Sequence, residues 1–427
     1  MLKDRLLQRL LFIVWMIAST AFTAQAETIK VRSSLDVNLA TGFGLDGDNE
    51  DLLRLGVQPK LEAKFKSGWK ADLHLTLKTA QGDVGLGTIE TFDELSRPLT
   101  LGDSSRIEID KATLSWRKRS TRLTLGKQTV AWGVLDGLQV TDRLDASRRQ
   151  EAVFTDERPD RLSRWGARAE FKKGGFGWDA VAFIDGSADQ LASQGSAYEV
   201  RASRFRAGLP IGVPTPDVSV ETSNDVTVGL RTKRKLGRGD VSALIIHGPD
   251  TEPVFRSSDT GVSLEYDTRT LLGATWQRSE GPRVWRIEAA SISDQPVNVS
   301  GAVLDVEDRQ RWLAGAGLDW DLSDSKFLNL QIGVDHVEGQ RLVRPNTDVI
   351  ATVRAQKGLS NDTIKLSAEL LTSLSDGDGT FRPAISWQKN DHTMLSAGVD
   401  VVWGDEEGLF GQFDNNDRVW FKVDWSV

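Results

Sequence analysis

Charged side chains of both signs crowd the segment between Asp136 and Arg168. The residues that we single out there are Asp136, Asp142, Asp145, Arg148, Arg149, Arg158, Arg164 and Arg168. Fixed charges beside a narrow watery opening discriminate among solutes, because a low-dielectric wall focuses their electric field. We therefore predict that these residues form a charged constriction. A solvated surface loop is the alternative, since long loops with mixed charge serve either purpose.

Groups that could perform catalysis are sparse by comparison. The chain has four histidines, at His74, His247, His336 and His392, and no cysteine. His74 and Thr76 share one face of an extended segment, but a nucleophile also needs a positioned base and an orienting group. Scattered histidines without cysteine do not make a metal site. We predict no enzyme activity, no catalytic residue, no cofactor and no metal.

The elements that must position the charges are β-strands. The last eleven residues alternate between apolar positions, at Val419, Phe421, Val423, Trp425 and Val427, and polar ones, at Arg418, Lys422, Asp424 and Ser426. Successive side chains of a strand point to opposite faces, so this segment has one apolar face and one wet face. Trp420 is the one large apolar residue on the wet face. The pattern is typical of the closing strand of a membrane β-barrel.

The same alternation recurs along the chain, for example in the hairpin formed by 53–65 and 69–77. A first count gives nineteen such segments, whereas bacterial single-chain barrels have even strand numbers. One phase of alternation runs from Val262 to Trp276, so we merge segments 261–267 and 270–279 into one strand. The prediction is eighteen strands, with sixteen as the alternative.

The connections between these segments alternate between short and long. The short ones are 66–68, 117–120, 172–175, 237–239, 280–282, 323–326, 358–361 and 389–391. The long ones are 41–51, 81–104, 133–162, 185–223, 249–260, 293–308, 338–347, 374–379 and 404–415. Short periplasmic turns and longer extracellular loops alternate in this way in outer-membrane barrels, which places both termini on the periplasmic side.

Composition and the N-terminal segment agree with export to a membrane. A charged fraction of 27% and a mean hydropathy of -0.32 exclude a bundle of apolar helices. A net charge of -8 argues against nucleic-acid binding, which needs a basic surface. Lys3, Arg5 and Arg9 precede the apolar run 10–21, and Ala24-Gln25-Ala26 follows it. We predict a cleaved secretory signal peptide at residues 1–26 and a single barrel domain at 27–427.

The expected fold is therefore all-β, a transmembrane antiparallel up-and-down β-barrel in the outer membrane of a Gram-negative bacterium. Tryptophans near the strand ends, with Trp132 among those at the loop end, suggest aromatic girdles. The wet faces carry charges of both signs, which are costly in a dry interior. We expect an aqueous lumen rather than a side-chain core. A soluble β-sandwich or propeller is the alternative.

Two short motifs carry a resemblance to a known family. The first is Leu125-Gly126-Lys127-Gln128 followed by Trp132-Gly133, Asp136-Gly137, Val140 and Asp142, and the second runs from Phe410 to Arg418. The first resembles a run in a Gram-negative outer-membrane β-barrel family of unknown function that is grouped with alginate-export-type porins. The second is similar to a run that is common before the last strand of such barrels. The resemblance implies a porin or an exporter and implies no substrate.

These observations together predict a porin-like channel for the diffusion of small polar or charged solutes, with at most a weak anion preference. An exporter for a polymer or lipid, and a non-conducting structural or adhesive barrel, are the alternatives. The expected partners are the lipid bilayer, lipopolysaccharide, small solutes, and the assembly machinery that recognises the C-terminal strand. No nucleic acid is expected.

Overall fold

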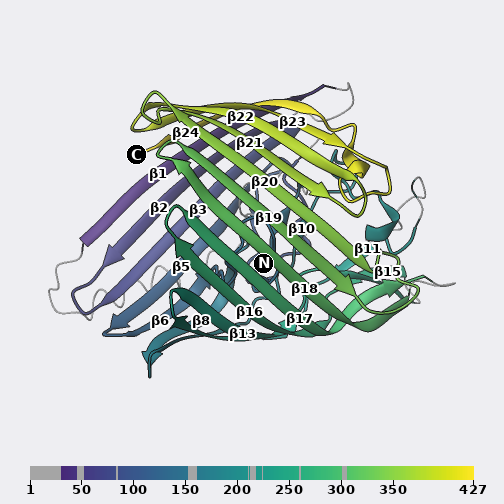
Figure 1. Ribbon diagram of the computed structural model, residues 1–427, viewed down its shortest axis with the longest axis horizontal. Coiled ribbons are helices and arrows are strands. Elements are labelled where there is room, and N and C mark those ends of the chain that lie inside the picture. The colour runs from purple at the N-terminus through teal and green to yellow at the C-terminus, as the bar shows by residue number, and fades with distance from the viewer. Residues whose placement is uncertain are drawn as a thin grey trace.

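The computed structural model describes residues 30–45, 52–82, 85–151, 161–209, 211, 218–223, 225–258, 261–300 and 305–427. The predicted signal peptide lies outside these residues. The described chain forms a closed antiparallel barrel of eighteen strands, which confirms the predicted fold and strand number. Strand β1 (Lys30–Gly44) pairs with β24 (Arg418–Ser426) and closes the cylinder (Figure 1). No helix in the described ranges has the length and apolar character to cross a membrane.

The other strands of the wall pair in chain order. They are β2 (Leu52–Lys64), β3 (Trp69–Gly82), β5 (Ser105–Lys118), β6 (Thr121–Gln128), β8 (Arg164–Lys173), β9 (Phe176–Phe183), β12 (Thr227–Leu236), β13 (Gly239–Pro249), β16 (Thr268–Glu280), β17 (Arg283–Val299), β18 (Asp305–Ser323), β19 (Lys326–Val337), β20 (Thr347–Leu359), β21 (Ile364–Ser373), β22 (Asp378–Asn390) and β23 (Thr393–Trp403). The strands tilt strongly, and the short turns lie at the same end as the C-terminus (Figure 1). The predicted alternation of short and long connections is thereby explained.

Short elements decorate the long loops. Strand β4 (Leu99–Thr100) pairs with β5, and β7 (Arg148–Arg149) pairs in parallel with β10 (Gln190–Leu191). Strands β11 (Val218–Glu221), β14 (Val254–Ser258) and β15 (Gly261–Glu265) form a separate sheet. Two 3-10 turns, η1 (Ser203–Phe205) and η2 (Gly411–Phe413), complete the loops.

The merger of 261–267 with 270–279 is wrong, although the total of eighteen is right. Strand β15 pairs with β14 and β11 outside the wall, and the wall strand β16 begins only at Thr268. The Arg256 guanidinium donates to the Glu265 carboxylate at 2.9 Å, which holds β15 on its own hairpin. The alternation continued in phase across two different sheets, so parity alone could not separate them.

Strand β18 shows how the wall divides its side chains. Trp312, Ala314 and Ala316 are exposed on the outer face, while Leu313 and Gly315 between them are buried on the inner face. The exposed tryptophans of the outer wall, Trp69, Trp285, Trp312, Trp387 and Trp425, agree with the predicted girdles. Trp132 does not belong to them. It is only 1% exposed and packs inside the barrel, which corrects its assignment.

A hydrophobic core lies within the barrel. It joins inward residues of the wall, namely Val181, Phe183, Leu244, Ile246, Leu271, Ala290, Ile292 and Leu313, to Val130, Trp132, Leu135, Val140 and Leu144 from the connection between β6 and β8. The expectation of an aqueous lumen without a side-chain core is wrong for this part of the interior. The physical reason is that the connection folds inward and covers one stretch of the wall.

Candidate functional site

The connection between β6 and β8 folds onto the inner face of the barrel, and we call its residues 129–151 the inner loop. Its anchor is Glu288 of β17, which is 1% exposed. The Glu288 carboxylate accepts hydrogen bonds from the Leu135 amide at 2.7 Å, the Thr141 amide at 2.9 Å and the Thr141 hydroxyl at 2.6 Å. The Val134 amide donates to it as well. Because a buried carboxylate is costly unless it is hydrogen-bonded, these donors and Glu288 stabilise each other.

Apolar packing fastens the same loop to the wall. The Trp132 indole lies over Gly229 of β12, where an added Cβ atom would come within 2.8 Å of the ring. The indole N–H donates to Asp179 at 2.9 Å, and the Arg231 guanidinium lies 5.4 Å from the ring centroid. Burying a large apolar side chain is worth about 1.5–3 kcal/mol. Five such side chains on the inner loop are enough to hold it against the wall.

Two glycines of the first sequence motif have a definite geometric task. Gly126 has a φ of 117°, and a Cβ atom there would lie 2.0 Å from the Ala112 carbonyl oxygen. A Cβ atom at Gly133 would meet Asp142 at 2.8 Å and Glu288 at 3.0 Å. Only glycine fits at these positions, since any side chain would push the inner loop off its anchor. The motif therefore marks the point where the chain leaves the wall and turns inward.

Arg148 and Arg149 form β7 at the far end of the inner loop. Arg148 donates to Glu108 on the inner face of β5 at 3.2 Å and to Gln190 at 3.0 Å. Arg149 donates to Asp189 at 2.5 Å and to the side-chain oxygen of Gln139 at 3.1 Å. Both guanidinium groups thus bridge the inner loop to other parts of the barrel interior.

Asp142 and Asp145 brace the inner loop internally. Asp142 accepts hydrogen bonds from the Trp132 amide at 3.1 Å and from Arg161 at 2.6 Å. Asp145 accepts the Val130 amide at 2.5 Å, and its second oxygen has no hydrogen-bond partner. Burial raises the pKa of Asp145 to about 7, because desolvation outweighs the Val130 hydrogen bond and the nearby arginines.

The remaining predicted residues are divided among the wall, the loop and the undescribed part. Arg164 is buried and donates to the Leu144 carbonyl and the Thr227 hydroxyl, both at 2.8 Å. Arg168 pairs with Asp179 at 2.8 Å. Asp136 faces Arg286 of β17 at 3.6 Å. Arg158 lies outside the described residues. The described members therefore surround the inner loop but contact different partners rather than one another.

A second segment crosses the interior, and we call residues 184–226, between β9 and β12, the crossing loop. At its beginning the Ala188 amide donates to the Thr91 carbonyl at 2.9 Å. Farther along, Arg204 reaches the opposite wall and pairs with Asp348 at 2.7 Å and Asp376 at 2.9 Å. The two loops meet where the Gln190 amide donates to the Ser147 carbonyl at 2.9 Å.

The second sequence motif receives the end of this crossing. The Tyr198 ring packs against Phe413 with centroids 5.8 Å apart. The Asn416 side-chain amide donates to the Ala197 carbonyl at 2.8 Å. The Gln412 carbonyl accepts the Arg201 amide at 2.8 Å. The motif before the last strand is thus a docking surface for the crossing loop.

Carboxylates and guanidinium groups form a connected chain beside the inner loop. Glu252 contacts Arg143 at 3.0 Å, Arg311 at 2.9 Å and Arg149 at 3.8 Å. Burial by itself raises the pKa of Glu252, but Arg311 and Arg143 outweigh it and hold the pKa well below its usual range. Glu252 therefore stays ionised and neutralises three arginines that approach from different elements.

Sequence reasoning missed the residues that anchor these loops. Glu288, Asp189, Glu252 and Arg204 were not among the predicted site residues. Glu288 occupies a polar position on a strand whose neighbours are apolar, which is a signal of an unusual inner contact. Arg204 carries no local signal, because its partner Asp348 lies 144 residues away.

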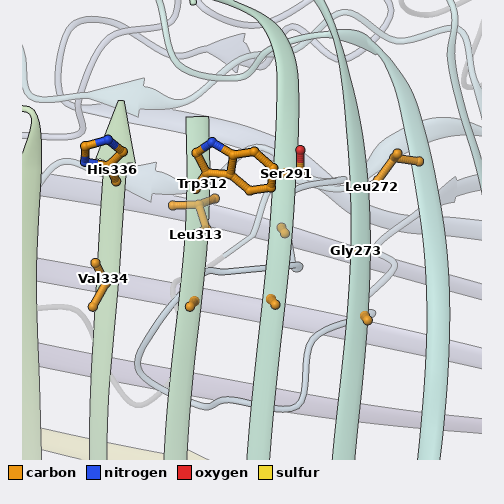
Figure 2. Close-up of a pocket in the computed structure, with 11 residues that line it drawn as sticks. Leu272, Gly273, Ser291, Trp312, Leu313, Val334 and His336 are labelled. Atoms are coloured by element: carbon orange, nitrogen blue, oxygen red, sulfur yellow. The ribbon is translucent and has the colours of Figure 1, made fainter. Parts of the chain in front are cut away.

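Two cavities flank this arrangement. One of about 250 Å³ lies between the inner loop and the wall, with Asp136, Gln139, Arg161, Gln277 and Arg286 in its lining. Another of about 500 Å³ is a shallow groove of the outer wall, where Trp312 lies between its own strand and the strand of Ser291, with His336 at the neighbouring strand end (Figure 2). The outer groove is apolar and faces away from the lumen, so it is no part of the solute site. In the described ranges no cluster of three or more His, Asp or Glu side chains could hold a metal ion.

Comparison with solved structures finds outer-membrane channels. OccAB1 of Acinetobacter baumannii superimposes with a TM-score of 0.55 at 9% identity over 93% of this chain and 96% of that chain. OccK8 (OprE) of Pseudomonas aeruginosa gives 0.54 at 8% identity over 93% and 98%. OccK2 (OpdF) of Pseudomonas aeruginosa, solved in complex with glucuronate, gives 0.52 at 9% over 93% and 98%. At such low identity the likeness shows the fold alone, which is that of Gram-negative outer-membrane porins.

No family model and no curated protein matches the sequence. The finer grouping with alginate-export-type porins therefore gains no support beyond the two short motifs.

Proposed function

We propose that this chain is a porin-like channel of the Gram-negative outer membrane that lets small polar or charged solutes diffuse through a passage narrowed by the inner loop. The observation that carries the proposal is the hydrogen bonding of the inner loop to Glu288 on the inner face of the wall. A loop fastened there reduces the bore without closing the cylinder. The charged groups of both signs around it give a polar, ion-accessible lining.

The solute class follows from size and polarity. Both internal loops occupy the barrel, which favours molecules of the size of a monosaccharide or amino acid over a polymer. The structure of OccK2 with glucuronate, a protein of the same fold, supports this size class. Most guanidinium groups near the inner loop are matched by carboxylates, as Arg311 is by Glu252 and Asp335, so we expect only weak anion preference.

The remaining predictions belong to the same proposal. Cleavage after Ala26 releases the barrel domain 27–427 for insertion, and the C-terminal strand β24 is the segment that the assembly machinery recognises. Lipopolysaccharide surrounds the loop end of the outer wall. The chain performs passive transport and no enzymatic reaction, in keeping with its fold.

Liposome swelling tests the solute class. Proteoliposomes of the purified protein are expected to swell in arabinose, glucose and amino acids, and to swell progressively less as solutes reach trisaccharide size. Swelling that is equally fast with oligosaccharides of many units would favour polymer export instead. Absence of swelling with every solute would favour a structural or adhesive barrel.

A further inference from the structure

One large aromatic side chain on the inner face is not used by either internal loop. Trp420 of β24 sits at an inward position, between the inward residues Arg418 and Lys422. Its Nε1–H donates to Asp400, a fully buried inward carboxylate of β23, at 3.0 Å. Within the described part of the chain it belongs to neither apolar cluster that the loops form inside the barrel. An indole that faces a polar lumen leaves apolar surface open to water, which is unfavourable without a further role.

The indole is held flat against the wall. Trp420 is register partner to Gly398 of β23 and to Gly42 of β1, so no side chain stands directly beside it. A Cβ atom at Gly398 would lie 2.4 Å from Cζ2 of the ring, which places the ring over the glycine backbone. Asp400 also receives Arg418 at 2.8 Å and Arg382 at 3.1 Å, and these contacts fix the acceptor that orients the indole. The ring is a preorganised surface.

Hydrogen-bonding side chains lie one pleat away on the same face. Lys422 follows Trp420 by two residues and is the register partner of Ser396, which in turn is the partner of Ser386. The Ser396 and Ser386 hydroxyls are 3.0 Å apart. Successive inward residues of one strand are separated by about 7 Å. A row of hydroxyl and ammonium groups therefore runs beside the ring at a distance that a small molecule can span.

We propose that Trp420 is a stacking platform for the ring of a small saccharide passing through the lumen. The indole N–H is already satisfied by Asp400, so only the ring face is available to a solute. A pyranose ring has an apolar face of C–H groups that packs on an aromatic face, and hydroxyl groups at its edge. Those hydroxyl groups would meet Lys422, Ser396 and Ser386. This inference rests on the proposed channel function and names one solute class for it.

Saturation-transfer NMR on the purified barrel tests the platform without requiring conduction. The barrel is held in a zwitterionic detergent without sugar headgroups, and D-glucose is compared with D-sorbitol, which has hydroxyl groups but no ring. We expect transfer to the glucose ring protons that clearly exceeds transfer to sorbitol. Trp420→Ala should weaken glucose binding about five-fold, in the range of aromatic stacking energies, and Trp420→Phe should retain part of it.

The matched control is Trp387→Ala, which removes the same side chain from the outer wall, where Trp387 is exposed. Its glucose signal should equal that of the unmodified protein. Gly398→Ala is a second variant that tilts the ring without changing its chemistry, and it should also reduce the signal. Heat-modifiable migration on a gel establishes that each variant is folded.

Three results would overturn the platform. They are equal transfer to glucose and sorbitol, an undiminished glucose signal in folded Trp420→Ala and Gly398→Ala, and transfer to benzoate without transfer to glucose, which would indicate an aromatic acid instead. A protein that binds glucose in this way but carries no current in a bilayer would contradict the proposed channel and leave the platform standing. A conducting protein without Trp420-dependent binding would contradict the platform alone.

Discussion

Glu288 on the barrel wall and Thr141 on the inner loop are joined twice, through the Thr141 amide at 2.9 Å and the Thr141 hydroxyl at 2.6 Å. The same carboxylate receives the Leu135 amide at 2.7 Å. One buried side chain thus fixes two parts of a loop that lie six residues apart. The position of the inner loop, and with it the bore of the channel, depends on this contact.

Replacing Glu288 with glutamine keeps its shape but turns one of its two acceptors into an amide donor. Donors that point at that atom lose their partner, so loop docking should weaken by about 2–3 kcal/mol. Hydrogen–deuterium exchange should then be faster at the amides of Leu135 and Thr141. Glu280→Gln is the matched control, since Glu280 is exposed at a short turn and pairs only with its neighbour Arg278 among its printed contacts. Unchanged protection in Glu288→Gln would contradict the anchoring role.

Neutralising Arg148 and Arg149 together should shift ion preference toward cations. The double replacement by glutamine leaves Glu108 and Asp189 without the guanidinium groups that they contact. Two negative charges are thereby released beside the inner loop, where a low-dielectric wall strengthens their field. Reversal potentials in a salt gradient measure the shift, with Arg278→Gln as the control. A reversal potential that does not move would place these arginines away from the ion path.

Asp145 predicts a pH dependence of barrel stability. Its pKa is raised from 3.8 to about 7 by burial, so the folded state keeps the proton while the unfolded state loses it. The resulting stabilisation is fully present below about pH 4 and is lost progressively as the pH rises to about 7. Asp145→Asn keeps an acceptor for the Val130 amide and should remove this part of the pH profile. Thermal unfolding between pH 4 and 8 checks it, and an identical profile in the variant would refute it.

A charged substitution on each face of the wall tests the orientation of the strands. Ala316→Asp places a carboxylate on the exposed outer face of β18 and should cost about 2 kcal/mol or block assembly. Ser34→Asp places one on the inner face of β1, where the register partner is Lys60, and should be tolerated. Heat-modifiable migration reports assembly. Equal tolerance of both substitutions would overturn the assignment of faces.

Much of the wall could be predicted because strand alternation is a local property. The faces of Ala316 and Gln331 follow from parity, and the total of eighteen strands follows from parity with an even count. The error at 261–267 has a definite cause: a loop hairpin alternates like a wall strand, and only its pairing with β14 and β11 distinguishes it.

The interior was less predictable because it depends on contacts between distant segments. Trp132 reads as an interfacial tryptophan until the inner loop is seen to fold inward, and Glu288 reads as one wet-face residue among many. The charges at Arg148, Arg149, Asp142 and Asp145 were correctly singled out, since their density marks an unusual loop. Their partners Glu108, Asp189 and Glu252 come from other elements, and no local pattern connects them.

Single-channel recording in planar bilayers tests the central claim most directly. The purified protein is compared with a variant in which residues 145–156 are replaced by a short Gly-Ser linker, after both have been shown to be heat-modifiable. We predict discrete conductance steps for the unmodified protein and clearly larger steps for the variant, because removing this segment widens the passage. A folded protein without any conductance, or a folded variant with unchanged conductance, would contradict the account of a channel narrowed by its inner loop.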